Sequence, residues 1–140
     1  MTIDELVALI GSDEMAKRGE ALRHVYQRGV DGAGDLVAVL RHPEANLVAR
    51  SWAMLALTAF REPAVVGVAH DVLVEALSDP SPTIRRHAIE TLMALGDAAA
   101  RDAIARLLTD DTLDPSAWGE DNCTVALMAR AAIDLFDRPR

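Results

Sequence analysis

Apolar residues recur along this chain at the spacing of amphipathic helices. Between the turn at Asp79 and the glycine at position 96, apolar side chains line one face of a helix: Ile84, Ala88, Ile89, Leu92 and Leu95. A second helix follows, with Asp97 at its N-cap position. The same pattern predicts helices at about 2–10, 13–28, 32–41, 44–61, 64–77, 81–95, 98–109 and 121–137, and no strand.

The helical pattern repeats as a two-helix unit. Ala21, Ala53 and Ala88 occupy equivalent positions, 32 and then 35 residues apart. In the same alignment an arginine stands three residues before each alanine, and a turn precedes each arginine. A repeat of this length predicts a stack of helix pairs in which each unit packs on its neighbours.

The segment from Leu77 to Asp97 has an Asp-Pro turn, an apolar-Arg pair at Ile84 and Arg85, an Ala-containing helix and a Gly-Asp exit. It resembles a HEAT repeat of the short bacterial, phycobilin-lyase type. The similarity is strong over 77–109, fair over 33–61 and weaker elsewhere. It implies an all-α fold: one domain, 1–140, forming a right-handed α-α superhelix, a HEAT-like solenoid of about eight antiparallel helices. It also implies that Asp79 and Arg85 or Arg86 form a rung between repeats.

Composition narrows the functional class. Of the 140 residues, 51% are apolar, which is ample for a hydrophobic core, and the net charge is −8. This charge repels phosphate backbones and anionic membranes, so we expect neither nucleic acid nor membrane as a partner. The single cysteine, Cys123, cannot form an internal disulfide, and the amino terminus lacks the features of a secretory signal. We therefore expect a cytoplasmic protein.

Candidate chemistry is sparse. The four histidines are scattered and form no metal-binding spacing; His42 is interpreted as a turn residue. No histidine lies near Cys123 in sequence, which argues against a cysteine nucleophile. The glycine-containing stretch 31–35 lacks a preceding strand and a third glycine, and is interpreted as a turn between helices. We expect no catalytic residue, no cofactor and no metal.

A binding surface is predicted on the second helix of each pair, which lines the concave side of a HEAT-like stack. Alignment of these helices places six charged or polar side chains outward: His70, Asp71, Glu75, Arg101, Asp102 and Arg106. Small residues occupy the matching positions of the earlier helices. Such a face favours a cationic guest helix or loop.

The carboxyl-terminal region offers a second surface. In the loop 110–122, Trp118 either packs back on the last helix or anchors a partner. The last helix is apolar around much of its circumference, because Leu127, Ala131 and Leu135 extend its apolar face. A terminal repeat needs a polar outside. We therefore expect this helix to contact a second subunit, giving a homodimer through residues 121–137, or another partner, or the loop.

The sequence thus predicts a non-enzymatic scaffold or adaptor for protein–protein interaction, which binds through its acidic concave face or its carboxyl-terminal helix. The alternative is a subunit of a lyase or chaperone that holds a bilin-like small molecule. A third possibility, nucleic-acid processing, conflicts with the net charge of −8.

Overall fold

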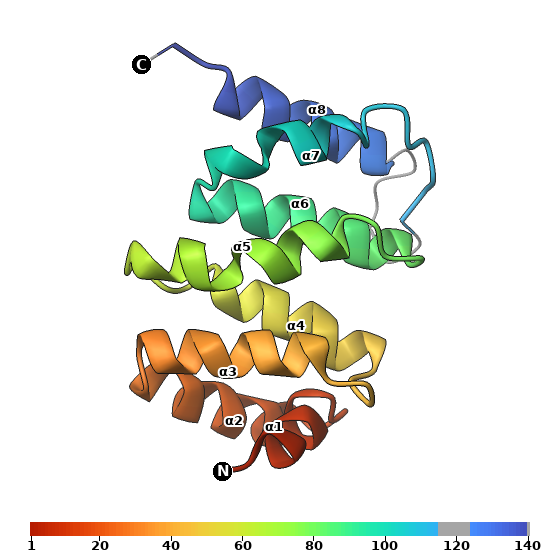
Figure 1. The fold of residues 1–140 in the computed structure, drawn as a ribbon. Coiled ribbons are helices and arrows are strands. Elements are labelled where there is room, and N and C mark those ends of the chain that lie inside the picture. Colours follow the sequence, from red (N-terminus) through yellow and green to blue (C-terminus); the bar gives the residue numbers. More distant parts are fainter. Residues whose placement is uncertain (115–123, 140) are drawn as a thin grey trace. The chain divides into compact units, whose positions relative to one another are not determined.

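The computed structural model describes residues 1–114 and 124–139 (Figure 1). Its helices are α1 (Ile3–Ile10), α2 (Met15–Gln27), α3 (Val30–Arg41), α4 (Leu47–Leu57), α5 (Ala64–Ala76), α6 (Pro82–Leu95), the 3-10 helix η1 (Ala98–Ala100), α7 (Arg101–Ala105) and α8 (Val125–Phe136). Within these residues there is no strand, only an isolated antiparallel bridge between Leu113 and Thr124. The predicted all-α class is confirmed; the handedness of a superhelix stays a prediction.

The chain forms two compact units, Met1–Val72 and Leu73–Arg140, and the boundary falls within α5. In the first unit α1 packs on α2, α3 and α4, and α3 packs on α4. The large side chains buried here come from all four helices: Leu6, Ile10, Val25, Leu36, Val39, Met54 and Leu57. That the whole chain acts as a single domain stays a prediction.

The glycines near the start of α3 correct one sequence interpretation. The stretch 31–35 is not a turn but lies inside α3. The turn is made instead by Gly29, whose φ of 59° is in the left-handed region that favours glycine. Gly32 has a different role, because a Cβ there would lie 1.9 Å from the carbonyl oxygen of Val25. Gly32 therefore allows α3 to approach the end of α2 closely.

In the second unit α6 and α7 both pack on α8. Both ends of α6 follow their local sequence signals. At its start the Ser81 hydroxyl accepts a hydrogen bond from the Ile84 amide, and at its end Gly96 adopts a left-handed conformation with φ of 70°. The predicted helix 98–109 is wrong in extent, because η1 ends at Ala100 and α7, which follows it directly, ends at Ala105. Asp97 stands at the N-cap position, but its side chain makes no capping hydrogen bond.

The repeated arginines make equivalent contacts in the two units. Arg18 donates through Nη1 to the Ser12 carbonyl oxygen at 2.9 Å, and Arg85 donates through Nη1 to the Asp79 carbonyl oxygen at 2.7 Å. Each acceptor lies six residues before its arginine. Arg85 also pairs with the Asp110 carboxylate at 2.9 Å. A helix arginine therefore fixes the turn before it and, at Arg85, links that turn to the segment after α7.

Candidate functional site

The predicted binding residues of α5 lie on its outward side. Asp71 and Glu75 are exposed and His70 is partly exposed. Because Asp71 and Glu75 are four residues apart on one helix, their carboxylates lie on the same face, one turn from each other. Two carboxylates at this spacing concentrate negative charge on the exposed side of α5. This arrangement suits a lysine or arginine side chain.

The predicted residues of α7 differ in their availability. Asp102 is exposed and pairs with Arg101 at 3.3 Å, whereas Arg106 is exposed and stands at the C-cap position after the helix. Arg101 is held by Asp137, the residue that follows α8. The Asp137 contact raises the pKa of the Arg101 guanidinium, and the hydrogen bonds from Arg101 lower the pKa of the Asp137 carboxyl. Arg101 therefore holds the end of α8 and is less available to a partner than the sequence suggests.

Two of the sequence candidates cannot be placed. Trp118 and Cys123 lie outside the described residues, as do residues 121–123 of the predicted dimerisation range 121–137. His70 and Asp71 belong to the first unit, whereas Glu75 and the α7 residues belong to the second. That they line one concave face stays a prediction.

A hollow of about 250 Å³ lies beside α1 in the first unit. The sequence analysis did not identify it, because its residues come from separate elements: Asp4, Val7, Ala8, Gly11, His42, Glu44 and Asn46. His42 is more than a turn residue, since its Nε2 lies 2.7 Å from Asp4 Oδ1, and these two residues are 38 positions apart. No local spacing in the sequence indicates this pair.

The hydrogen bonds of His42 indicate which ring nitrogen is the donor and which is the acceptor. The Glu44 amide donates to Nδ1 at 3.1 Å, so Nδ1 carries no hydrogen and Nε2 is the donor to Asp4. Both ring nitrogens of His42 therefore have a hydrogen-bond partner. The polar lining of the hollow, His42 with the carboxylates of Asp4 and Glu44, offers hydrogen-bonding and charged groups for recognition.

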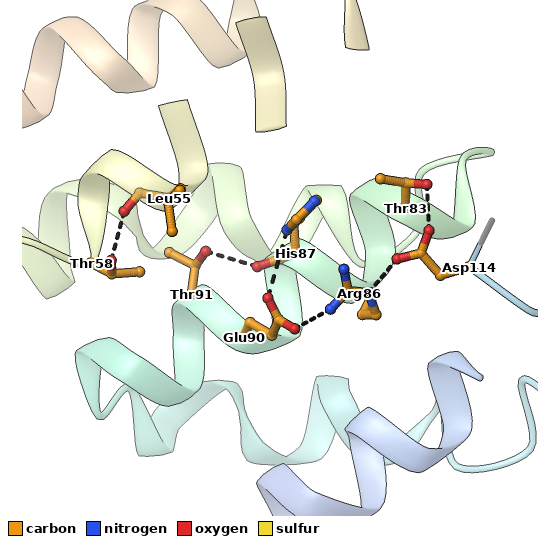
Figure 2. A network of polar contacts seen from close by, with 8 residues as sticks. All are labelled: Leu55, Thr58, Thr83, Arg86, His87, Glu90, Thr91 and Asp114. Atoms are coloured by element: carbon orange, nitrogen blue, oxygen red, sulfur yellow. Dashed lines mark hydrogen bonds and ion pairs between the residues drawn. The ribbon is translucent and has the colours of Figure 1, made fainter. Parts of the chain in front are cut away.

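A polar network in the second unit holds the segment after α7 against α6 (Figure 2). The Asp114 carboxylate is fully buried; it accepts a hydrogen bond from Thr83 Oγ1 at 2.7 Å and pairs with Arg86, which also contacts Glu90. Charges buried in this way are retained when they are paired and hydrogen-bonded. The network explains why α6 carries polar residues on a packed face, and its role is to fix the segment 110–114.

The same segment supplies hydrogen-bond acceptors to the start of α8. The carbonyl oxygens of Asp110 and Thr112 accept from the amides of Ala126 and Val125, at 2.6 and 3.1 Å. These amides belong to the first turn of α8 and have no acceptor within the helix. Burial alone would raise the pKa of the Asp110 carboxyl, but hydrogen bonds from Thr112 and the Arg85 guanidinium lower it below its usual value. The Asp110 carboxylate is therefore charged at neutral pH and pairs with Arg85. The backbone carbonyl of the same residue positions the start of α8.

The outward side of α8 carries exposed apolar residues, as the sequence predicts. Leu127 is 56% exposed and Leu135 is 42% exposed, and Ala131 between them is also exposed. We call Leu127, Ala131 and Leu135 the leucine stripe. The opposite side is buried in the second unit: Val125, Ala129, Ala132 and Ile133. The leucine stripe is thus additional to the apolar surface that α8 needs for its own packing.

Metal clusters and membrane-spanning helices are both absent from the described ranges 1–114 and 124–139. No group of three or more His, Cys, Asp or Glu side chains there could hold a metal ion. No helix in those ranges is both long and apolar enough to cross a bilayer. Candidate surfaces in these ranges include the outward carboxylates, the hollow beside α1 and the leucine stripe.

Comparison with known families gives one match. A family model of HEAT repeats matches residues 35–118, which is more than half of the chain. Comparisons with curated proteins and with solved structures give no match. The matched region begins within α3 and extends past α7, and it includes the repeat at 77–109.

Proposed function

The chain belongs to the HEAT repeat family, and from this premise we propose that it is a non-enzymatic scaffold that binds a protein partner carrying a cationic helix or loop. HEAT repeats generally mediate protein–protein interaction. We assign the contact to the exposed carboxylates Asp71 and Glu75 of α5, which we call the acidic face, with Asp102, His70 and Arg106 as further candidate residues. Trp118 is a further candidate anchor.

The observation that carries this proposal is the pair of exposed carboxylates Asp71 and Glu75, one turn apart on α5. They contribute to the net charge of −8, which accelerates encounter with a cationic partner and slows encounter with an anionic one. Exposed charges contribute individually little to affinity, so the partner must also bury apolar surface. Small outward residues such as Ala38 would leave room for it.

The test uses a fluorescent amphipathic peptide with lysines and arginines on one face, measured by anisotropy. Asp71→Lys/Glu75→Lys should weaken its binding by about tenfold or more at low salt, since attraction is replaced by repulsion. Asp13→Lys/Glu20→Lys is the matched control, because it changes net charge equally at exposed positions outside the acidic face. If both double variants weakened binding equally, the effect would come from net charge alone. That result would refute the acidic face as the binding site.

The small-molecule alternative gains no support from the hollow beside α1. Its volume of about 250 Å³ is below the range of about 300–1,000 Å³ that is typical of ligand pockets. A bilin-like ligand would need a larger, mostly apolar cavity. A cytoplasmic location and the absence of nucleic-acid binding remain predictions from composition.

A further inference from the structure

We propose that the leucine stripe of α8 binds the leucine stripe of a second copy of this chain, with the two helices antiparallel about a two-fold axis at Ala131. The resulting contact is weak and symmetric. It uses a different surface from the acidic face, so each proposal can fail without the other.

The first argument is the apolar surface itself. Leu127 and Leu135 are each separated from Ala131 by four residues, so the three side chains form one row along α8. An antiparallel pairing about Ala131 places Leu127 beside Leu135 of the second copy, and Leu135 beside Leu127. The small Ala131 lies at the centre, where the two helix backbones come closest. Each exposed leucine therefore gains an apolar partner.

Apolar exposure continues beyond the start of α8. Leu113 is 54% exposed and is bridged to Thr124, the N-cap residue of the helix. Leu113 therefore adds an exposed apolar residue close to the start of α8.

The second argument is charge complementarity, which identifies the occupant. Arg130 and Asp134 are exposed and lie on one edge of the leucine stripe. The two-fold axis brings like edges together, so Arg130 lies opposite Asp134 of the second copy, with about 3 Å between them along the helix axis. The pairing occurs twice, whereas the axis brings one pair of like charges, the two Arg130 side chains, to the same separation along the helix axis. Opposite-charge pairs therefore outnumber like-charge pairs at this edge, which makes it complementary to itself.

Within its own helix, the alternative partner of Arg130 is Asp134. That intrahelical pair is weaker than the pair with the second copy. Neither Arg130 nor Asp134 has an ion pair among the described residues. They are four residues apart, but the arginine precedes the aspartate, which is the less favourable order for an intrahelical pair. Both charges are therefore available to the second copy.

The size of the contact sets its expected strength. α8 has 12 residues, and a helix of that length is about 18 Å long, so it covers less area than a standard interface. We therefore expect a monomer–dimer equilibrium that depends on concentration. Sedimentation velocity from about 10 μM to about 1 mM spans the range in which such a weak interface dissociates.

The apolar part is tested with Leu127→Glu/Leu135→Glu, which should weaken dimerisation by roughly a hundredfold or more because four buried leucines become charged. Leu47→Glu/Leu55→Glu is the matched control: Leu47 and Leu55 are similarly exposed, at 48% and 52%, but lie on α4. The control should leave the equilibrium unchanged. Far-UV circular dichroism melts verify that all variants fold.

A charge swap tests whether the occupant is a second copy. Arg130→Asp alone and Asp134→Arg alone should each weaken dimerisation by about tenfold, because each creates two like-charge contacts. The double variant Arg130→Asp/Asp134→Arg should restore it, since the swapped edge is again self-complementary. A strict monomer at all concentrations would overturn the proposal, as would a dimer that ignores the leucine substitutions or a double swap as weak as the single ones.

Discussion

Arg101 and Asp137 form a two-bond ion pair: Arg101 Nε donates to Oδ1 at 3.0 Å and Nη2 donates to Oδ2 at 2.8 Å. The pair joins the first residue of α7 to the residue that follows α8. Both ends of α8 are therefore held by polar contacts, because the segment 110–112 already satisfies its first amides. This leaves its exposed side as the surface free for association.

The Arg101 contact makes a small part of the stability depend on pH. Hydrogen bonding to Arg101 lowers the pKa of Asp137 in the folded state below its value of 3.8 in the absence of the contact. The stabilisation is therefore fully present above that ordinary pKa and is lost as pH falls through the lowered one. We expect Asp137→Asn to be less stable than the wild type at neutral pH and equally stable in strong acid.

Urea unfolding at a series of pH values measures this difference. Because Asp137 is exposed, the effect should be small and should shrink with added salt. Asp111→Asn is the control, since Asp111 is exposed and has no ion pair among the residues the structure describes. If the difference in the free energy of unfolding between Asp137→Asn and the wild type grew as the pH falls, the Arg101–Asp137 pair would not stabilise the fold.

The buried Asp114 should matter far more. Asp114→Asn keeps the shape of the side chain but leaves the half-buried Arg86 without this carboxylate, so we expect a loss of about 2 to 4 kcal/mol in the free energy of unfolding. Thr83→Val removes only a neutral donor to Asp114 and should cost about 1 kcal/mol. Thr109→Val, at an exposed position, should change stability by less than about 0.5 kcal/mol.

Hydrogen exchange separates this role from a general loss of stability. Release of the segment 110–114 should expose the amides of Val125 and Ala126, whose acceptors are in that segment. We expect these two amides to exchange faster in Asp114→Asn even under conditions where the core amides of α6 remain protected. Unchanged exchange at both would show that Asp114 does not hold the segment.

Elements with local signals at both ends could be predicted well from sequence. Helix α6 was expected at 81–95 and is found at Pro82–Leu95, because Ser81 and Gly96 define its ends through contacts within a few residues. The helix expected at 98–109 has no such signal at its end, and α7 ends at Ala105. Alternation of apolar positions places a helix but does not determine its length.

Contacts between distant residues could not be predicted in the same way. His42 and Asp4 meet across the first unit, and Asp114 meets Arg86 across the second, at separations of 38 and 28 residues. Their positions follow from helix packing, which no local spacing encodes. The outward acidic residues of α5 were predictable because exposure on a helix follows from its 3.6-residue period.

Two glycines of α3 test how closely it packs on α2. An alanine at position 32 would place its Cβ 1.9 Å from the Val25 carbonyl oxygen and 2.8 Å from the carbonyl carbon, so the backbone must move. At position 34 a Cβ would meet no heavy atom within 4 Å outside its own stretch of helix. The two positions differ in the room available to a Cβ atom, although both lie in α3 and both are replaced by alanine.

We therefore expect opposite effects on the free energy of unfolding. Gly32→Ala should destabilise the protein by about 2 kcal/mol or more, since a packed backbone cannot yield as a flexible side chain does. Gly34→Ala should stabilise it by about 0.5 to 1 kcal/mol, because alanine loses less conformational entropy in a helix. Denaturant unfolding measures both. A neutral Gly32→Ala would show that α2 and α3 are not in this close contact, whereas destabilisation by Gly34→Ala would mean that its outward side is covered.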